Sequence, residues 1–364
     1  MKQYMIEVSH ISSVHHYNDS RIVKRMVTSL LSQKTFKVKW VAQQASLSDL
    51  PGDVCFDLPK VKGKIWRMLY LIPRVFHYVR VSRSDYYHLH DPELFLLVYF
   101  FRSKKFILDI HENYWISIEN KQYIPLFLRS IIQSLVRAIL DNAVKRAEKV
   151  VVAWPSISDE VDIETFVIQN YPSIVQETDN DLHIKSSDEL TFLYSGLICF
   201  DRGFKESLEV FKKISKSNNC RFILIGRFKT EHEKRYFHDN KGDENIHYYE
   251  WMNQKELYSW MRIAHFGFIF FKDLPNHRYS VPNKLFEYIH MECIPLLNDL
   301  PFLSTFNRYH SVGLTGNICN LDDFINKIQK AIDNGLDDFH INHKLIKNSF
   351  TWKSQEKEFL HLYK

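Results

Sequence analysis

Histidine and carboxylate residues follow two apolar stretches in the first half of the sequence. They are His88, His90 and Asp91 in YYHLHDPELF, and Asp109, His111 and Glu112 in FILDIHENYW. If both stretches are strands of a parallel sheet, these side chains lie at strand ends, where catalytic groups collect, and histidine is the commonest general base near neutral pH. Each residue alone could instead be a hydrogen-bonded loop residue. Two such groups at neighbouring strand ends favour a catalytic site.

The segment SSVHHYNDSRIVKR leads into the first long helical pattern and carries Asn18, Asp19, Ser20 and Arg21. Asn18 or Asp19 suits the N-cap of that helix, because a short polar side chain can accept a hydrogen bond from an amide of the first turn. The remaining polar groups are expected to face the same cleft as the strand-end histidines.

A second group of candidates surrounds a glycine turn in the second half. In YSGLICFDRGF, Gly196 follows an apolar stretch directly, and Arg202 and Gly203 precede a helical pattern that includes Lys205. Free amides at a helix start favour an anion, and a guanidinium can clamp it. The turn is therefore a candidate site for a nucleotide diphosphate. The alternative is that the glycines only make the turn and that Arg202 is solvated.

The segment SVPNKLFEYIHMECIPLL places a carboxylate, Glu287, within a short amphipathic helix. With Pro282 in the first turn, Lys284 and Glu287 share one face of this helix. Leu285 and Ile289 lie opposite and can pack against a sheet. A carboxylate in the cleft can accept two hydrogen bonds from the diol of a nucleotide ribose. The alternative is a surface ion pair between Lys284 and Glu287, worth only about 0.3 kcal/mol.

Apolar stretches of strand length alternate with helical patterns along the whole sequence, which is typical of parallel sheets covered by helices on both faces. Strands are expected at residues 4–9, 36–42, 85–90, 105–111 and 149–154, and, in the second half, at 190–196, 220–226, 246–251, 266–271 and 294–298. Helices are expected at about residues 19–33, 203–217, 254–263 and 283–292. The sequence therefore predicts an α/β protein with two sheets.

A polar segment without consistent periodicity separates the two halves. We place the first domain at residues 1–172, the linker at 173–189 and the second domain at 190–348. The final segment, residues 349–364, is an amphipathic helix with Trp352, Phe359 and Leu362 available for its apolar side. No strand follows this helix, so its packing partner must lie elsewhere in the fold.

The composition is that of a folded protein, with 45% hydrophobic and 25% charged residues among 364 and a net charge of +5. No glycine precedes Gly52, so the first strand-to-helix turn lacks the GxGxxG loop of dinucleotide-binding proteins, and a nicotinamide or flavin dehydrogenase is disfavoured. The five cysteines form no CxxC pair and no cluster with histidines at ligand spacing. Neither a zinc site nor a disulfide framework is therefore expected.

The N-terminal sequence reaches polar residues before an apolar run could form a signal peptide, and no stretch of 18 apolar residues occurs. We therefore expect a cytoplasmic protein that does not span a membrane. Two segments, 60–83 and 123–146, mix Lys and Arg with aromatic and aliphatic residues. Helices of this composition can lie on an anionic membrane surface, or they can be ordinary packing helices of a domain.

Seven segments, in order along nearly the whole chain, resemble the signatures of family 4 (group 1) glycosyltransferases, particularly those that build bacterial surface polysaccharides. They are HHYNDSRIVKRMVTSLLSQKTFKVKWVA, YHLHDPELF, KKFILDIHENYW, YSGLICFDRGF, FILIGRF, SVPNKLFEYIHMECIPLLNDLP and FTWKSQEKEFLHLY. The resemblance implies the GT-B architecture, with two Rossmann-like domains facing across a cleft. The C-terminal domain would hold a nucleotide-sugar donor and the N-terminal domain an acceptor, and the terminal helix would pack back on the N-terminal domain. It also implies metal-independent transfer with retention of anomeric configuration.

The resemblance further implies roles for individual residues. His111 would lie beside the transferring sugar, with Asp91 and Glu112 as further catalytic candidates. Glu287 matches the second Glu of the family's Glu-x7-Glu pattern, at the donor ribose, and Arg202 matches a basic diphosphate clamp. The donor side comprises Gly196, Arg202, Lys205, Gly226, Tyr279, Asn283, Lys284 and Glu287, and the acceptor side comprises Asn18, Asp19, Arg21 and His90.

The sequence departs from the family pattern at three places. Tyr279 stands where the first Glu of the pattern is expected, so recognition of the donor hexose must differ from that of members with both acids. Leu197 stands where a basic residue often follows the first glycine. The glycine-rich first loop is replaced by His15 to Arg21.

Together these observations predict a glycosyltransferase on the inner leaflet of the cell membrane. It would move a sugar from a nucleotide-diphosphate sugar to a lipid-linked or polysaccharide acceptor of O-antigen, capsule or exopolysaccharide synthesis. No cofactor, metal or nucleic-acid partner is expected. The alternatives are a nucleotide-sugar epimerase or hydrolase of the same fold, and an inactive subunit that only binds a nucleotide sugar.

Overall fold

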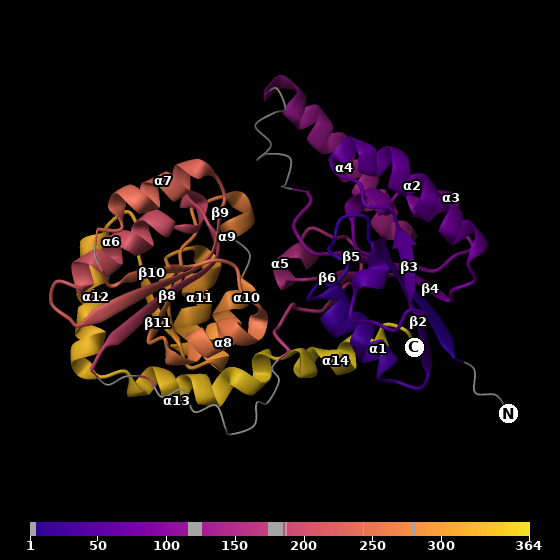
Figure 1. Ribbon diagram of the computed structural model, residues 1–364. Coiled ribbons are helices and arrows are strands. Elements are labelled where there is room, and N and C mark those ends of the chain that lie inside the picture. The colour runs from indigo at the N-terminus through magenta and orange to yellow at the C-terminus, as the bar shows by residue number, and fades with distance from the viewer. Residues whose placement is uncertain (1–4, 116–125, 174–184, 186–187, 243, 279–280) are drawn as a thin grey trace. The chain divides into compact units, whose positions relative to one another are not determined.

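The computed structural model describes residues 5–115, 126–173, 185, 188–242, 244–278 and 281–364, which form two compact units (Figure 1). The first unit comprises Met1–Ser173 and Trp352–Lys364, and the second comprises Ile174–Thr351. Most of the segment that we expect to be a linker, 173–189, lies outside the described residues. Each unit contains a parallel sheet with helices on both faces, so the α/β prediction with two sheets is confirmed.

The described part of the first unit contains a sheet in the order β3-β2-β1-β4-β5-β6-β7, with every neighbouring pair parallel. Its strands are β1 (Ile6–Ile11), β2 (Phe36–Gln43), β3 (Cys55–Leu58), β4 (Tyr86–Leu89), β5 (Phe106–Ile110), β6 (Lys149–Val152) and β7 (Phe166–Val167). The short strands β3 and β7 at the edges were not among the predicted strands. The strand order reverses between β1 and β4, and ligands of open α/β sheets bind at such a switch point.

Figure 1 shows the helices of the first unit on the two faces of its sheet. One face carries α2 (Lys64–Val81), α3 (Leu97–Phe100) and α4 (Leu126–Arg146), and α5 (Pro155–Ser158) follows β6. The other face carries α1 (Thr28–Leu31) and α14 (Trp352–His361). The helix predicted at about 19–33 begins with a π-helical segment, Ile22–Val27, before α1.

Helix α14 is attached to the first unit through its apolar side chains. The Trp352 indole donates a hydrogen bond to Ser29 Oγ at 2.7 Å. Phe359, Leu362 and Tyr363 are almost fully buried in the core that also contains Trp40. This packing explains why an amphipathic helix follows the last strand pattern: its apolar side covers the sheet of the first unit.

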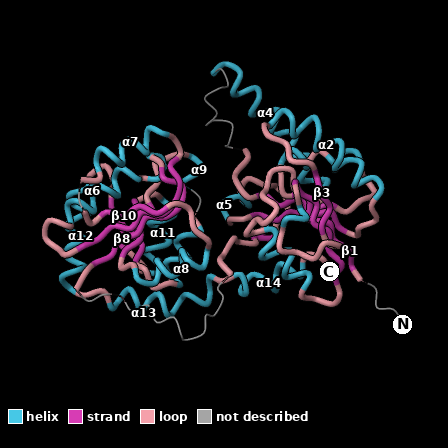
Figure 2. Tube along the Cα trace, viewed as in Figure 1, coloured by secondary structure: helices cyan, strands magenta, loops and turns pink. Residues whose placement is uncertain are grey.

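The described part of the second unit contains a parallel sheet in the order β10-β9-β8-β11-β12-β13 (Figure 2). Its strands are β8 (Leu190–Ile198), β9 (Cys220–Phe228), β10 (Ile246–Tyr249), β11 (Phe266–Ile269), β12 (Ile294–Asn298) and β13 (Leu314–Gly316). Stacked and edge-on phenylalanines fill much of the core, for example Phe192 against Phe266 at 5.0 Å. The order reverses between β8 and β11.

The helices of the second unit also cover both faces of its sheet. They are α6 (Phe204–Ile214), α7 (Glu231–Asn240), α8 (Gln254–Ile263), α9 (Pro275–Arg278), α10 (Asn283–His290), α11 (Pro301–His310), α12 (Leu321–Asn334) and α13 (Asp337–Ile346). Helices α6, α7 and α12 contribute phenylalanines to one core, and α8, α10 and α11 lie on the opposite face in Figure 1.

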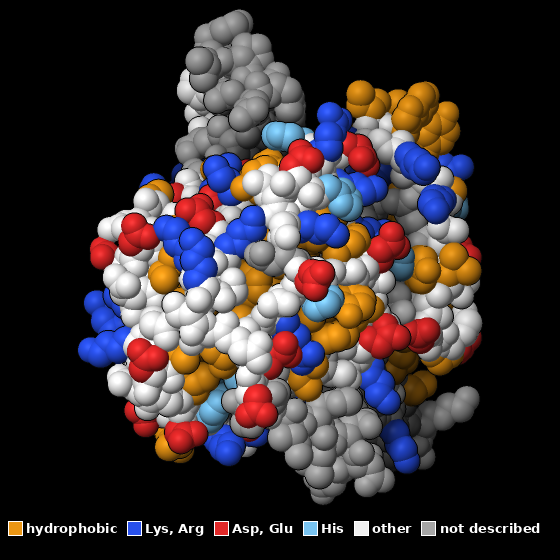
Figure 3. All heavy atoms as spheres, turned by 60° about the vertical axis from the view of Figure 1, so that its left-hand side comes forward, with side chains coloured by type: hydrophobic (Ala, Val, Ile, Leu, Met, Phe, Trp, Pro, Cys, Tyr) orange, Lys and Arg blue, Asp and Glu red, His pale blue; other side chains and the backbone are white. Residues whose placement is uncertain are grey.

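None of the helices within the described ranges is both long enough and apolar enough to cross a membrane. On the face of the molecule drawn in Figure 3, basic and acidic side chains are interspersed, with hydrophobic side chains between them. The net positive charge of the chain is therefore not gathered into a single patch on that face.

Candidate functional site

In the second unit, the candidate donor site lies near the carboxyl ends of β8 and β9. Gly196 is not in a turn after the strand, as we expected, but within β8, which continues to Ile198. Gly196 and Gly226 are paired across these strands, and both have positive φ angles, +118° and +149°. A Cβ atom on Gly226 would collide with the carbonyl oxygen of Gly196. Glycine is required here because the two backbones approach more closely than any side chain allows.

Arg202 is placed beside this strand end by a one-turn segment, Phe200–Arg202, that follows β8. Gly203 then adopts a left-handed conformation, φ +62°, and begins α6. The Arg202 side chain is exposed, its NH1 group lies 3.9 Å from the position of a Cβ on Gly196, and its guanidinium lies 6.0 Å from the centre of the Phe271 ring. The guanidinium is therefore available to an anion at the end of β8.

Helix α10 brings Lys284 to the same strand end. The Lys284 amino group donates a hydrogen bond to Ser195 Oγ at 2.7 Å, and Ser195 Oγ also lies 3.3 Å from the Tyr288 hydroxyl. Burial lowers the pKa of Lys284, and nearby Arg202 lowers it further, while Glu287 raises it. Two cationic side chains thus lie close enough to repel each other, which is an arrangement that a bound polyanion would stabilise.

Glu287 lies one turn after Lys284 and is half-buried. Among the residues that the structure describes, it forms no ion pair with Lys284; the Tyr258 hydroxyl lies 3.4 Å from its Oε1 atom. The surface ion pair that we considered as an alternative is therefore not what holds Glu287. The carboxylate keeps acceptor capacity for the hydroxyl groups of a ligand.

The expected start and end of this helix need small corrections. Pro282 is not in the first turn but at the N-cap, with an extended ψ of 138°, because the helix starts at Asn283. The helix ends at His290 rather than Glu292, since Glu292 has a left-handed φ of +56°. The predicted burial of Leu285 and Ile289 is confirmed, as both are fully buried.

The remaining donor-side residues are less closely placed. Asn283 is half-buried at the start of α10, and Lys205 is exposed on α6. Tyr279 lies outside the described residues. The structure therefore brings together Gly196, Arg202, Lys284 and Glu287, with Gly226 paired to Gly196 on the neighbouring strand.

In the first unit, Asp91 anchors the loop after β1. Its Oδ2 atom accepts hydrogen bonds from the Ser12 hydroxyl at 2.9 Å and from the Ser13 amide at 2.5 Å. His15 Nε2 lies 3.5 Å from the other oxygen. Asp91 is only 2% exposed, so its contacts stabilise the conformation of the loop after β1 and do not present the carboxylate to solvent.

His111 follows β5 and is held by Asp109. The Nε2 atom of His111 lies 2.8 Å from Asp109 Oδ2, and its side chain is 15% exposed. Arg21 binds the same carboxylate through Nε at 3.2 Å and NH2 at 2.8 Å, and Arg21 itself is buried. Arg21, which we expected to face the cleft, thus holds Asp109 from within the core.

The electrostatics of Asp109 follow from these partners. Burial alone would raise the pKa of this fully buried carboxyl, but Arg21 and His111 hold it well below its usual value. His90, also fully buried, adds a hydrogen bond from Nδ1 at 3.0 Å. Asp109 is therefore an ionised acceptor that fixes the ring of His111.

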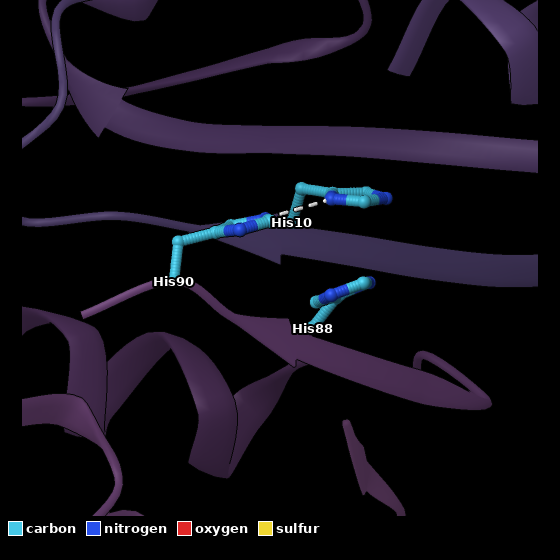
Figure 4. Close-up of side chains that lie close together, drawn as sticks. All are labelled: His10, His88 and His90. Carbon is cyan, nitrogen blue, oxygen red and sulfur yellow. Dashed lines mark hydrogen bonds between the residues drawn. The ribbon is translucent and has the colours of Figure 1, made fainter. Parts of the chain in front are cut away.

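Three buried imidazoles lie next to this pair, and Figure 4 shows them close together with their rings nearly parallel. The ring planes of His10, His88 and His90 are 12–26° apart, with centroids separated by 4.6–5.1 Å. Their nitrogens are close enough together for a metal ion. However, a metal ion at this position would have to displace contacts that these nitrogens already form, since His88 Nδ1 lies 2.6 Å from the Tyr363 hydroxyl. His10 and His90 instead share a hydrogen bond of 2.9 Å.

A second group with suitable atoms comprises His90, Asp109 and His111. Both histidine nitrogens already bind Asp109 Oδ2, and Arg21 Nε approaches the same oxygen. A metal ion would have to displace these hydrogen bonds beside a guanidinium. This group therefore fits a buried hydrogen-bond network better than a metal site.

The other predicted residues of the first unit lie around the helix entry and the β5 end. Asp19 Oδ1 accepts hydrogen bonds from the amides of Arg21 and Ile22 at the helix entry, although the N-cap position of the π-helical segment is Arg21 and not Asn18 or Asp19, as we expected. Asn18 donates to Asp49 at 2.7 Å. Glu112 is exposed beyond His111.

Sequence reasoning missed the contributions of Ser195, His10 and Tyr363. Ser195 precedes Gly196 within β8 and resembles any strand serine. His10 lies within the apolar pattern of β1, but its pairing in register with His88 could have been inferred from two strands with a histidine near the end. Tyr363 gave no local signal, because only the folding of α14 brings it to these histidines.

The sequence matches no protein-family model and no curated protein. Solved structures share the fold. Sucrose-phosphate synthase from Thermosynechococcus elongatus matches with a TM-score of 0.73 and 12% identity over 98% of each chain. A structure described as trehalose-6-phosphate from E. coli, bound with UDP-2-fluoro glucose, matches with a TM-score of 0.71 and 8% identity over 98% of each chain.

WaaG, a glycosyltransferase involved in lipopolysaccharide biosynthesis, matches with a TM-score of 0.70 and 12% identity over 96% of this chain and 99% of that one. These proteins are GT-B glycosyltransferases, so the predicted GT-B fold is confirmed. At such low identity the likeness establishes the fold and not the reaction.

Proposed function

We propose that the protein is a glycosyltransferase that binds a nucleoside-diphosphate sugar in its second unit. The observation that carries this proposal is the grouping of Arg202, Lys284 and Glu287 at the end of β8. Two cations and a carboxylate acceptor lie beside Gly196 of β8, near the switch point of a parallel sheet. The solved structure bound with UDP-2-fluoro glucose has the same fold, which supports a nucleotide sugar as the ligand.

In the proposed mechanism, positive charge stabilises the departing diphosphate. Arg202 and Lys284 would interact with the charge that develops on the leaving oxygens as the anomeric carbon becomes electron-poor. Because Lys284 is already held by Ser195, little reorganisation is needed when the charge develops. Glu287 would accept hydrogen bonds from the ribose diol. We propose that these side chains replace a metal ion and that transfer proceeds with retention.

On the acceptor side, we propose that His111 contacts the substrate. It is the member of the buried network that reaches solvent, while Asp109 fixes its ring. Asp91 would shape the adjoining loop, and Glu112 would provide an exposed carboxylate near the same strand end.

We further propose that the acceptor is a lipid-linked surface glycan, as in family 4 enzymes, and that the first unit binds the inner leaflet. The first turns of α2 support this proposal, because their large apolar side chains are exposed: Ile65 71%, Trp66 54%, Met68 45%, Leu69 60% and Tyr70 47%. Lys60, Lys62 and Lys64 are exposed just before and at the start of this helix. Apolar side chains next to lysines suit the interface of an anionic bilayer. The role of WaaG in lipopolysaccharide biosynthesis is consistent with such an acceptor.

The donor can be identified by thermal-shift screening of UDP, GDP, ADP, CDP and dTDP and of their sugars. The stabilising sugar is then incubated with lipid-linked glycans from membrane extracts, and release of the nucleoside diphosphate is measured. We expect release only when acceptor is present, without added metal and in the presence of EDTA. Failure of every nucleotide to stabilise the protein would contradict the proposal. Release or isomerisation without acceptor would favour a hydrolase or an epimerase.

A further inference from the structure

Tyr363, which follows α14, reaches two buried histidines that belong to strands β1 and β4 of the first unit, His10 and His88. Its hydroxyl lies 2.6 Å from His88 Nδ1 and 3.3 Å from His10 Nε2. All three residues are at most 1% exposed. The hydroxyl therefore has hydrogen-bond partners on two histidines and is shielded from water.

The hydrogen bonds continue from His10 to the candidate catalytic residue. His10 Nδ1 lies 2.9 Å from His90 Nε2, as the dashed line in Figure 4 shows. His90 Nδ1 lies 3.0 Å from Asp109 Oδ2, and His111 Nε2 lies 2.8 Å from that same oxygen. An unbroken series of contacts thus leads from Tyr363 to His111 through the interior of the unit.

The ionised carboxylate of Asp109 determines where the hydrogens of this series lie. A carboxylate only accepts, so His90 carries its hydrogen on Nδ1 and His111 carries one on Nε2. Burial, first of all, lowers the pKa of His90 to about 4 and holds the pKa of His10 well below its usual value, so both are neutral at pH 7. A neutral imidazole has a single N–H. His90 Nε2 therefore accepts from His10 Nδ1, and His10 Nε2 is left as an acceptor.

The hydroxyl of Tyr363 completes the series as the donor to His10 Nε2, and its oxygen then accepts from His88 Nδ1. This assignment leaves one buried polar atom, His88 Nε2, without a hydrogen-bond partner. If Tyr363 donated to His88 instead, His10 Nε2 would lose its donor, and His88 Nε2–H would still lie 4.0 Å from Asp109. That assignment leaves two unsatisfied groups, and each costs about 1–3 kcal/mol.

We propose that Tyr363, His10 and His90 are positioning residues for His111. The oriented series presents the His90 N–H to Asp109, and Asp109 in turn holds His111 as the Nε2–H tautomer. The Nδ1 atom of His111 is then the nitrogen that can accept a hydrogen bond from a substrate hydroxyl. The docking of α14 is thereby linked to the tautomer of His111. Only the contact between His111 and substrate depends on the function proposed above.

Nitrogen-15 NMR of the histidine side chains in the full-length protein tests this proposal without an activity assay. Long-range correlations at pH 7.5 distinguish the two tautomers of each imidazole. We expect His10, His88 and His90 as Nδ1–H tautomers and His111 as the Nε2–H tautomer. An Nε2–H tautomer at His88 would mean that Tyr363 donates to His88 and not to His10, which would remove Tyr363 from the proposal. An Nδ1–H tautomer at His111 would overturn the proposal as a whole.

The variant Tyr363→Phe removes the hydroxyl and keeps the ring. We expect it to shift the side-chain nitrogen resonances of His10, His90 and His111, whereas Tyr86→Phe, which alters a ring packed edge-on against Tyr363, leaves them unchanged. With an identified donor and acceptor, Tyr363→Phe should lower kcat about fivefold or more and leave the donor KM within about twofold. Unchanged His111 resonances in Tyr363→Phe would overturn the coupling. Absence of nucleotide binding in the wild-type protein would contradict the proposed function and not the tautomers.

Discussion

The buried histidines of the first unit make its stability depend on pH between 7 and 5. His10, His88 and His90 are fully buried, and burial is the main reason why the pKa of each is lowered from 6.5, to about 4 for His90. In the unfolded chain these imidazoles take up protons below about pH 6.5, while in the fold they stay neutral. Stability is therefore fully present above pH 6.5 and falls as the pH decreases toward 4.

The size of this effect follows from the proton uptake of the unfolded state. For a histidine with a pKa of 6.5 unfolded and about 4 folded, lowering the pH from 7 to 5 reduces the free energy of unfolding by about 2 kcal/mol. His10 and His88 act in the same direction, because burial also lowers their pKa values. Asp109 adds nothing in this window, because its depressed pKa affects stability only below about pH 4.

Urea unfolding at pH 7 and pH 5 measures this dependence. Five of the seven tryptophans belong to the first unit, so a Trp251→Phe, Trp260→Phe background makes fluorescence report on that unit alone. In this background, His88→Gln should reduce the difference in unfolding free energy between the two pH values, because it removes an imidazole that burial keeps neutral in the fold. His77→Gln, at an exposed position of α2, should leave it unchanged. An identical pH dependence with and without His88 would refute the claim that the fold keeps this imidazole neutral.

Three further predictions concern the second unit and the membrane surface. Gly226→Ala should destabilise the second unit by about 3 kcal/mol or more, because the new Cβ atom collides with the Gly196 carbonyl oxygen. Calorimetry measures this loss, and Gly52→Ala, where a Cβ atom meets no neighbour, is the control. Lys284→Met should weaken binding of the stabilising nucleoside diphosphate about tenfold or more in calorimetric titration while the protein remains folded, since a charged hydrogen-bond donor is lost. Unchanged affinity would show that Lys284 does not face the ligand. Trp66→Glu should weaken binding to phosphatidylglycerol vesicles, measured by co-sedimentation, about tenfold or more, whereas Tyr309→Glu, at another exposed aromatic residue, should not. Equal binding by both variants would show that α2 does not contact the membrane.

Local patterns in the sequence were sufficient to predict the main strands and the close approach of the backbone at Gly196. Glycines near strand ends indicate positions where the backbone needs a positive φ angle, as Gly196 and Gly226 show. The amphipathic pattern of α10 correctly predicted that Leu285 and Ile289 are buried. The edge strands β3 and β7 are too short to give a clear period. The strand-end glycines and the amphipathic pattern of α10 depend on neighbours in the sequence, so a sequence pattern can predict them.

Long-range pairing of polar groups could not be predicted in the same way. Arg21 resembled a cleft residue from its place at a helix entry, but it forms a buried ion pair with Asp109, which is 88 positions away. Asp91 resembled a catalytic acid and anchors a loop instead of standing free. Tyr363 meets His10 across 353 positions. Such contacts are fixed by the topology of the sheet and by the docking of α14, which no local pattern encodes.

The most direct test of the account is whether Glu287 recognises the ribose of a bound nucleoside diphosphate. Calorimetric titration compares the stabilising nucleotide with its 2′-deoxy form, in the wild type, in Glu287→Gln, and in Glu256→Gln as a matched control on α8. We predict that the wild type and the control prefer the ribonucleotide by about tenfold, as expected for a hydrogen bond to a charged group, and that Glu287→Gln largely loses this preference. An equal preference in all three proteins, or no nucleotide binding by the wild type, would contradict the proposed donor site.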